Sequence, residues 1–94
     1  MPSKLRLRQT ISLPPHPNGD FDHGDFDPQT EHVFVANTAA GAIEVIDGKQ
    51  WQHLASIPDC PEASGVLCAQ EERRIFAAAR GAGKLLVIGQ ILPA

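Results

Sequence analysis

The sequence lacks several features that would assign it to a familiar class of protein. It has only two cysteines, Cys60 and Cys68, and no C-x-x-C pair, so it offers neither a disulfide framework nor a zinc motif. Its apolar segments are too short and too interrupted to cross a membrane. The first residues lead into a proline-rich stretch and not into the apolar run of a signal peptide, so the chain as written is expected in the cytoplasm.

Basic charge is also scarce. Eight Lys and Arg residues stand against eleven Asp and Glu residues, which gives a net charge of −3. Nucleic-acid binding needs a basic patch, and the basic residues are scattered, so no nucleic-acid partner is expected. Lys4, Arg6 and Arg8 do gather near the start, but on a strand they would share one side, which is typical of a solvated edge.

Convincing helical periodicity is the third feature that is missing. Residues 60–73 are the only candidate helix, and Pro61 and Gly65 weaken it. The chain consists instead of short apolar segments separated by turns rich in Pro, Gly, Asn and Asp. The expected strands are residues 5–13, 24–27, 33–37, 42–47, 51–57, 64–69, 74–79 and 84–88.

Two of these strand pairs repeat one another. Residues 33–47 match residues 75–89 at a spacing of forty-two, with the identities Phe34/Phe76, Ala36/Ala78, Gly41/Gly83, Val45/Val87 and Ile46/Ile88. In the preceding segment Gly24/Gly65 and Gln29/Gln70 match at a spacing of forty-one, which aligns Asp25 with Val66. A repeat of this length made of short strands predicts β-propeller blades or a similar array, with Phe34 and Phe76 buried at equivalent places.

The apolar runs support stacked units. Residues 33–36 and 85–88 are continuously apolar, as in strands that are covered on both faces. We therefore predict an all-β fold of two four-stranded antiparallel units within a single segment, residues 1–94. Residues 5–13 form an outer strand, residues 20–57 the first blade and residues 62–92 the second blade, which lacks an outer strand of its own.

Residues 33–48, VFVANTAAGAIEVIDG, resemble the YVTN-type (YncE-like) β-propeller repeat. The second unit departs from that pattern, since Ala79 stands at the place of Asn37 and Gly89 at that of Asp47. The resemblance implies about seven blades and no catalytic residue, so the chain is expected to be an incomplete propeller or a fragment. Because two blades cannot close a ring, the implied partners are the remaining blades of a longer propeller or copies of the chain itself. A truncated member of an exported family would lie outside the cytoplasm.

The acidic stretch of residues 20–27 is the one candidate for a cofactor site. Asp20, Asp22, His23 and Asp25 could together hold a divalent metal, although the spacing fits no EF-hand. The alternative is that these acids cap backbone amides beside a turn and face water. No other cofactor is predicted.

Propeller topology predicts which end of the molecule carries the richer chemistry. The connections after residues 37, 57 and 79 and the loop before residue 20 should emerge on one side, where loops on a rigid scaffold bind ligands. The candidate binding residues on that side are His16, Asp20, Asp22, His23, Asn37, Glu62 and Arg80. The turns on the opposite side, among them residues 70–73, are expected to be plain solvated turns.

The preferred functional interpretation is a non-catalytic binding or scaffold module for a protein or small-molecule ligand. One alternative is part of a metal-dependent lactonase-like or other hydrolytic propeller enzyme that uses the acidic stretch. Another is a truncated fragment without independent function. Metal analysis separates the first alternative from the preferred interpretation, and light scattering separates an assembling chain from an aggregating fragment.

Overall fold

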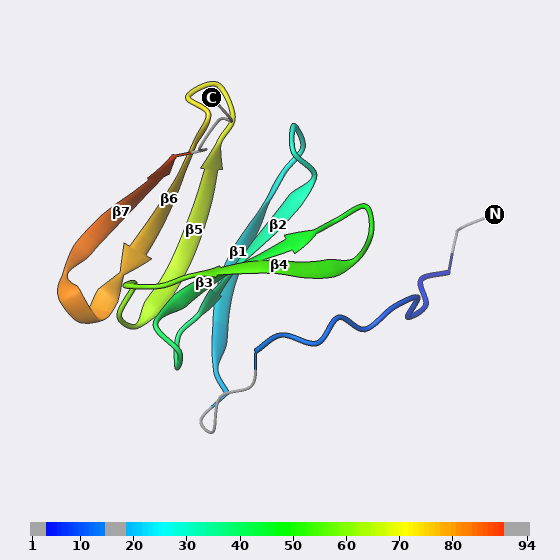
Figure 1. The fold of residues 1–94 in the computed structure, drawn as a ribbon, viewed down its shortest axis with the longest axis horizontal. Coiled ribbons are helices and arrows are strands. Elements are labelled where there is room, and N and C mark those ends of the chain that lie inside the picture. The colour runs from blue at the N-terminus through cyan, green and yellow to red at the C-terminus, as the bar shows by residue number, and fades with distance from the viewer. Residues whose placement is uncertain (1–3, 15–18, 90–94) are drawn as a thin grey trace.

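The computed structural model describes residues 4–14 and 19–89, and within them the fold is all-β, as predicted. The strands form two antiparallel sheets, sheet A in the order β1-β2-β3-β4 and sheet B in the order β5-β6-β7 (Figure 1). Their bounds are β1 Phe21–Asp27, β2 His32–Asn37, β3 Ala42–Asp47, β4 Gln52–Ile57, β5 Ala63–Ala69, β6 Arg74–Ala79 and β7 Lys84–Gly89, with a 3₁₀ turn η1 at Arg80–Ala82. No helix in the described ranges is long and apolar enough to span a membrane.

The two sheets repeat one another residue by residue. The pairs Asp25↔Phe34 and Phe34↔Val45 in sheet A become Leu67↔Phe76 and Phe76↔Val87 in sheet B when forty-two is added to each number. The register of the first strand also breaks at the same place in both sheets, after Phe21 in β1 and after Ala63 in β5. The spacing of forty-two therefore holds throughout, and the alignment of Asp25 with Val66 at forty-one is wrong by one residue.

The turns between paired strands repeat as well. Gly41 and Gly83 precede β3 and β7, and both have a positive φ, 65° and 60°. A side chain is disfavoured in this left-handed conformation, which explains why glycine stands at both places. Glu31 and Arg73, forty-two residues apart, close the β1–β2 and β5–β6 turns and also have positive φ values, 59° and 56°.

Side chains alternate between the two sides of a strand, and we call these sides the front and back faces of each sheet. In sheet A the front residues are Phe34, Ala36, Ile43 and Val45, and the back residues are Val33, Val35, Asn37, Glu44 and Ile46. In sheet B the equivalent front residues are Phe76, Ala78, Leu85 and Val87, and the back residues are Ile75, Ala77, Ala79, Leu86 and Ile88.

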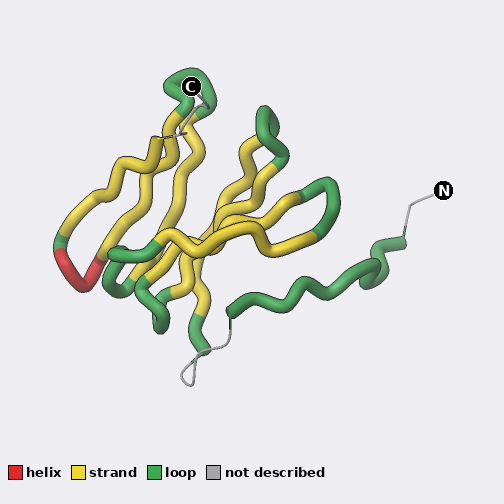
Figure 2. The backbone as a smooth tube through the Cα atoms, in the orientation of Figure 1, coloured by secondary structure: helices red, strands yellow, loops and turns green. Residues whose placement is uncertain are grey.

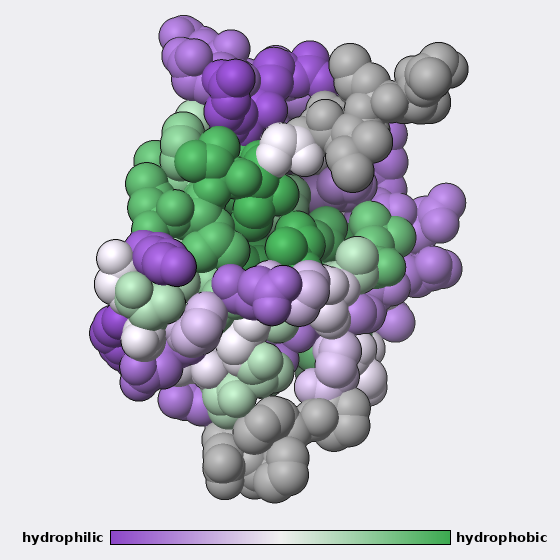
Figure 3. Space-filling model, turned by 60° about the vertical axis from the view of Figure 1, so that its left-hand side comes forward, coloured by the Kyte–Doolittle hydropathy of each residue, from purple (hydrophilic) through white to green (hydrophobic). Residues whose placement is uncertain are grey.

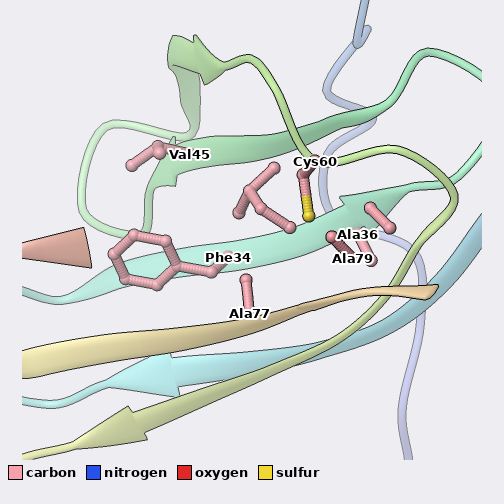
Figure 4. Packing of buried hydrophobic residues seen from close by; sticks show 8 residues of the cluster. Phe34, Ala36, Val45, Cys60, Ala77 and Ala79 are labelled. Atoms are coloured by element: carbon pink, nitrogen blue, oxygen red, sulfur yellow. The ribbon is translucent and has the colours of Figure 1, made fainter. Parts of the chain in front are cut away.

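The front face of sheet A packs on the back face of sheet B, and this interface is the hydrophobic core. Phe34 is 6% exposed, while Ala77 and Ala79 of the other sheet are buried completely or almost completely. Figure 4 shows the ring of Phe34 beside Ala77, with the Cys60 thiol reaching into the same cluster. Alanines on sheet B leave room for the larger side chains of sheet A, so the two faces differ in size and fit together.

Residues 5–13 do not form the predicted outer strand. Residues 4–14 are loop in Figure 2, without ladder pairing, and Leu5 and Leu7 are 100% and 83% exposed. The segment meets the fold where the Arg8 guanidinium lies 5.5 Å from the centre of the Trp51 ring. Alternating apolar residues predict only which side of a strand would be buried, and a strand also needs a neighbouring edge to pair with.

The prediction of two equally buried phenylalanines is also corrected. Phe34 and Phe76 do occupy equivalent positions in the two sheets, but only Phe34 lies between sheets, and Phe76 is half-buried on the front face of sheet B. Sheet A has the four strands predicted for the first unit, and sheet B has three within the described residues, in keeping with the predicted lack of an outer strand in the second unit.

Candidate functional site

Part of the predicted binding set meets at one end of the molecule, where the β2–β3 and β4–β5 connections lie. The Thr38 amide donates to the Asp20 carbonyl at 2.9 Å, and the Thr38 hydroxyl donates to the Ala63 carbonyl at the start of sheet B. The Arg80 amide donates to the Glu62 carbonyl at 3.3 Å. These bonds hold Asp20, Glu62 and Arg80 at the same end, as the topology predicted, but through their backbone atoms.

The other predicted binding residues have different surroundings. Asp22 and His23 form an exposed contact, with 3.5 Å between Oδ1 and Nε2. Asn37 is fully buried and its amide turns toward the back face of sheet A. His16 lies outside the described residues. The binding of a ligand at this end of the molecule stays a prediction.

The carboxylate of Asp25 has a structural role. Its Oδ1 accepts the Phe26 amide proton at 2.8 Å, and its Oδ2 accepts the Cys68 amide proton of β5, also at 2.8 Å. The second bond joins the first strand of sheet A to the first strand of sheet B. Leu67 holds the equivalent position in sheet B. The carboxylate is therefore not part of the repeated sheet pattern, and it serves the contact between the two sheets.

The remaining acids of the stretch are also apart from one another. Asp27 holds the β1–β2 turn by accepting the Gln29 amide at 3.1 Å and the Thr30 hydroxyl at 2.9 Å. Among residues 4–14 and 19–89, no three His, Cys, Asp or Glu side chains are placed to share a metal ion. The described structure thus does not assemble the predicted metal set of Asp20, Asp22, His23 and Asp25, and backbone capping accounts for Asp25 and Asp27.

A buried polar cluster on the back face of sheet A was not predicted from the sequence. Glu44 of β3 is 1% exposed and accepts hydrogen bonds from the side chains of both neighbouring strands. Asn37 Nδ2 donates to Glu44 Oε2 at 2.8 Å, and Ser56 Oγ donates to Glu44 Oε1 at 2.5 Å. His53 Nε2 lies 2.8 Å from the same Oε1. The cluster ties β2, β3 and β4 together through one carboxylate.

The environment of Glu44 favours its ionised form. Burial alone would raise the pKa of Glu44, but the hydrogen bonds from Ser56, Asn37 and His53 and the charge of His53 outweigh burial, so the pKa lies below its ordinary value of 4.5. One polar atom of the cluster is left over, because Asn37 Oδ1 is buried and has no hydrogen-bond partner among the described residues. A buried acceptor of this kind is uncommon in a folded protein.

The cluster combines Ser, His and Glu but does not have the geometry of a catalytic triad. In a triad the acid binds one ring nitrogen of the histidine and the serine binds the other. Both Glu44 Oε1 and Ser56 Oγ approach the same nitrogen of His53, at 2.8 and 3.5 Å, and the serine hydroxyl already donates to the carboxylate. The serine hydroxyl is therefore held by the carboxylate and not by the far nitrogen of the ring, and the three hydrogen bonds satisfy a buried charge.

A pocket of about 190 Å³ opens between the sheets at the opposite end, beside the β1–β2 and β5–β6 turns. Its apolar wall consists of Phe34, Val45, Ile57, Ile75 and Ile88, and polar residues of the two turns surround it. Cys68 also lines it, and burial, together with the nearby charges of Asp25 and Asp27, raises the pKa of this thiol to about 11. The sequence predicted solvated turns at this end and gave no sign of the pocket.

The front face of sheet B carries several exposed large hydrophobic side chains. Leu67, Leu85 and Val87 are 59%, 63% and 60% exposed. Figure 3, in which the β5–β7 side comes forward, shows a broad hydrophobic area bordered by hydrophilic residues. A shallow hollow lies within it, lined by Gly65, Val66, Leu67, Phe76, Ala78 and Leu85. Exposed apolar patches of this kind make the front face of sheet B a candidate binding surface.

Comparison of the chain with protein-family models, with curated proteins and with solved structures gave no match in any of the three.

Proposed function

We propose that the chain is a two-unit piece of a β-propeller and acts as a non-catalytic binding module, whose binding surface is the front face of sheet B. The observation that carries this proposal is the mismatch between equivalent residues. Val45 in sheet A is 8% exposed, whereas its counterpart Val87 in sheet B is 60% exposed. The two sheets have equivalent front faces, but that of sheet A is covered by sheet B, and that of sheet B is exposed.

Two features favour propeller blades over an ordinary sandwich of two sheets. In a propeller every sheet meets its neighbour front to back. The front face of sheet A packs on the back face of sheet B in this way, and the two sheets have the same register. The first strands of neighbouring blades also lie close together. The bond from the Cys68 amide to Asp25 links β1 and β5 in this manner.

The polar groups with catalytic potential favour binding over catalysis. Glu44 is saturated by three side chains, and the carboxylates of Asp25 and Asp27 hold backbone and turn positions. The centre of the front face of sheet B is made of the apolar side chains of Leu67, Phe76, Leu85 and Val87, and an apolar surface stabilises a complex by leaving water. We therefore propose that the front face of sheet B recognises the surface of another sheet.

Binding of an apolar fluorescent dye tests the assignment at concentrations where the chain is a single molecule. Dye fluorescence should rise with the wild-type chain and fall strongly with Leu85→Glu, which puts a charge on the exposed face. The matched control is Leu7→Glu, because Leu7 is also exposed but lies in the N-terminal loop. If both variants bind the dye as the wild type does, the front face of sheet B is not the binding surface.

A further inference from the structure

We propose that the front face of sheet B binds the back face of sheet A of a second copy of the chain, head to tail. This inference rests on the proposed function and names the partner of the same surface. It starts from the core of the molecule, where the structure contains one complete example of a front face covered by a back face.

The internal interface defines what a front face accepts. Phe34, Ala36 and Val45 of sheet A are covered by a back face with alanine and aliphatic side chains. At the equivalent positions of sheet B stand Phe76, Ala78 and Val87, the same three residue types. Because shape and residue size are repeated, the surface that fits the front face of sheet B is another back face.

Sheet A carries the second back face of the described chain, and part of it is open. Phe26 is 46% exposed at the position equivalent to Cys68, and Val33 and Val35 beside it are half-buried. These residues correspond to the part of sheet B that packs into the core. The apolar surface that this back face offers is confined to β1 and β2, because Ile46, Glu44 and Asn37 are already only 6%, 1% and 0% exposed.

The buried cluster makes this back face compatible with apolar contact. Glu44 is 1% exposed, and its carboxylate already accepts hydrogen bonds within sheet A. Docking of an apolar surface therefore adds no cost of removing an unpaired charge from water. The leftover acceptor, Asn37 Oδ1, lies at the same face. Ala79 and Leu86 replace Asn37 and Glu44 at the internal interface, where the back face is already covered.

Front and back faces differ, so the contact is heterologous. Each copy would use its front face for one neighbour and its back face for the other, and successive sheets along the assembly repeat the rotation that relates sheet A to sheet B. Because each copy contributes two sheets, the contact closes into a ring when twice that rotation divides a full turn. Pairing of two front faces would give an isologous dimer instead, and a longer chain could supply the partner sheet in place of a copy. The experiment separates these cases.

The test uses sedimentation to measure the mass of the 94-residue chain from low micromolar to near-millimolar concentration. The wild-type mass should rise above the 10.1 kDa of one chain. Leu85→Glu blocks the front face of sheet B, and Phe26→Glu blocks the back face of sheet A. Each should weaken association by about a hundredfold or more, because an unpaired carboxylate would be buried in the contact. Leu7→Glu is the control and should associate as the wild type does.

Mixing the two blocked variants gives the decisive result. The Leu85→Glu chain keeps an open back face and the Phe26→Glu chain keeps an open front face, so an equimolar mixture should form complexes of two chains and none larger. If Phe26→Glu alone still pairs and mixing adds nothing, front faces pair with each other and the proposal is wrong.

Two further outcomes are informative. A wild-type chain that stays at the mass of one molecule at every concentration overturns self-assembly, while dye binding to the front face would still support the proposed function. Circular dichroism checks that each variant keeps its strands. If Leu85→Glu does not fold, Val87→Lys blocks the same face at a position that is 60% exposed, and it should give the same masses.

Discussion

Truncating Phe34 and Phe76 separately measures the difference between a covered and an open front face. Phe34 is 6% exposed and borders the pocket of about 190 Å³, so its removal enlarges an existing cavity. We expect Phe34→Ala to destabilise the chain by about 3–5 kcal/mol, at the upper part of that range because the surroundings cannot close the space. Phe76 is half-buried on the open face. Since full burial of such a side chain contributes about 1.5–3 kcal/mol, Phe76→Ala should lower the free energy of unfolding by about 1 kcal/mol.

The assay is urea unfolding at low protein concentration, followed by the fluorescence of Trp51, the single tryptophan, and by circular dichroism. Unchanged slopes with urea would show that both variants unfold as the wild type does, so that the midpoints report stability. Equal losses for the two variants would refute the reasoning, because they would mean that Phe76 is as well covered as Phe34 in the free chain.

The same pair of variants also responds to assembly. If copies dock on the front face of sheet B, the native state is stabilised as protein concentration rises. The destabilisation caused by Phe76→Ala should then grow with concentration, while that of Phe34→Ala should stay constant.

Four further predictions concern the polar groups. The folded-state pKa of Glu44 lies below 4.5, so its ionised carboxylate stabilises the fold at pH values above the unfolded pKa. This stabilisation is lost as the pH falls through the folded pKa. Glu44→Gln should therefore flatten that part of a plot of unfolding free energy against pH. Asn37→Asp places a second carboxylate beside Glu44 Oε2, so one of the two must bind a proton, and the variant should gain stability as the pH falls from neutral. Asp25→Ala leaves the Cys68 amide without its acceptor and should lower the free energy of unfolding by about 1–3 kcal/mol in the same urea assay. The control Asp22→Ala removes only an exposed contact and should change the free energy of unfolding by less than about 0.5 kcal/mol. The Cys68 thiol, with its pKa of about 11, should react slowly with iodoacetamide at neutral pH and rapidly after unfolding, as mass spectrometry can follow.

Seven of the expected strands were predictable from local features of the sequence. Alternation, apolar runs and turn residues located seven strands within a few residues of their ends, and the repeat aligned Phe34 with Phe76 correctly. The segment of residues 5–13 shows the limit of this reasoning. Its alternation is local, but strand formation depends on a partner edge elsewhere in the fold.

The site was less predictable because it depends on register. Glu44 stands in an apolar strand, AIEVID, and a charged residue there was the one available signal of a buried polar cluster. Identifying His53 and Ser56 as its partners requires the pairing of β3 with β4, which includes a bulge between Val45 and Ile46. Likewise, the identity Gly24/Gly65 suggested an alignment one residue away from the observed one, and a shift of one residue exchanges the two faces of a strand.

The most direct test of head-to-tail assembly is a map of backbone NMR signals as the concentration of the chain increases. The account predicts that amide signals on the front face of sheet B, at Leu67, Leu85 and Val87, change together with those of Phe26 and Val33 on the back face of sheet A. The signal of Leu7 should stay constant. Changes confined to the front face of sheet B, or no change at any concentration, would contradict the account.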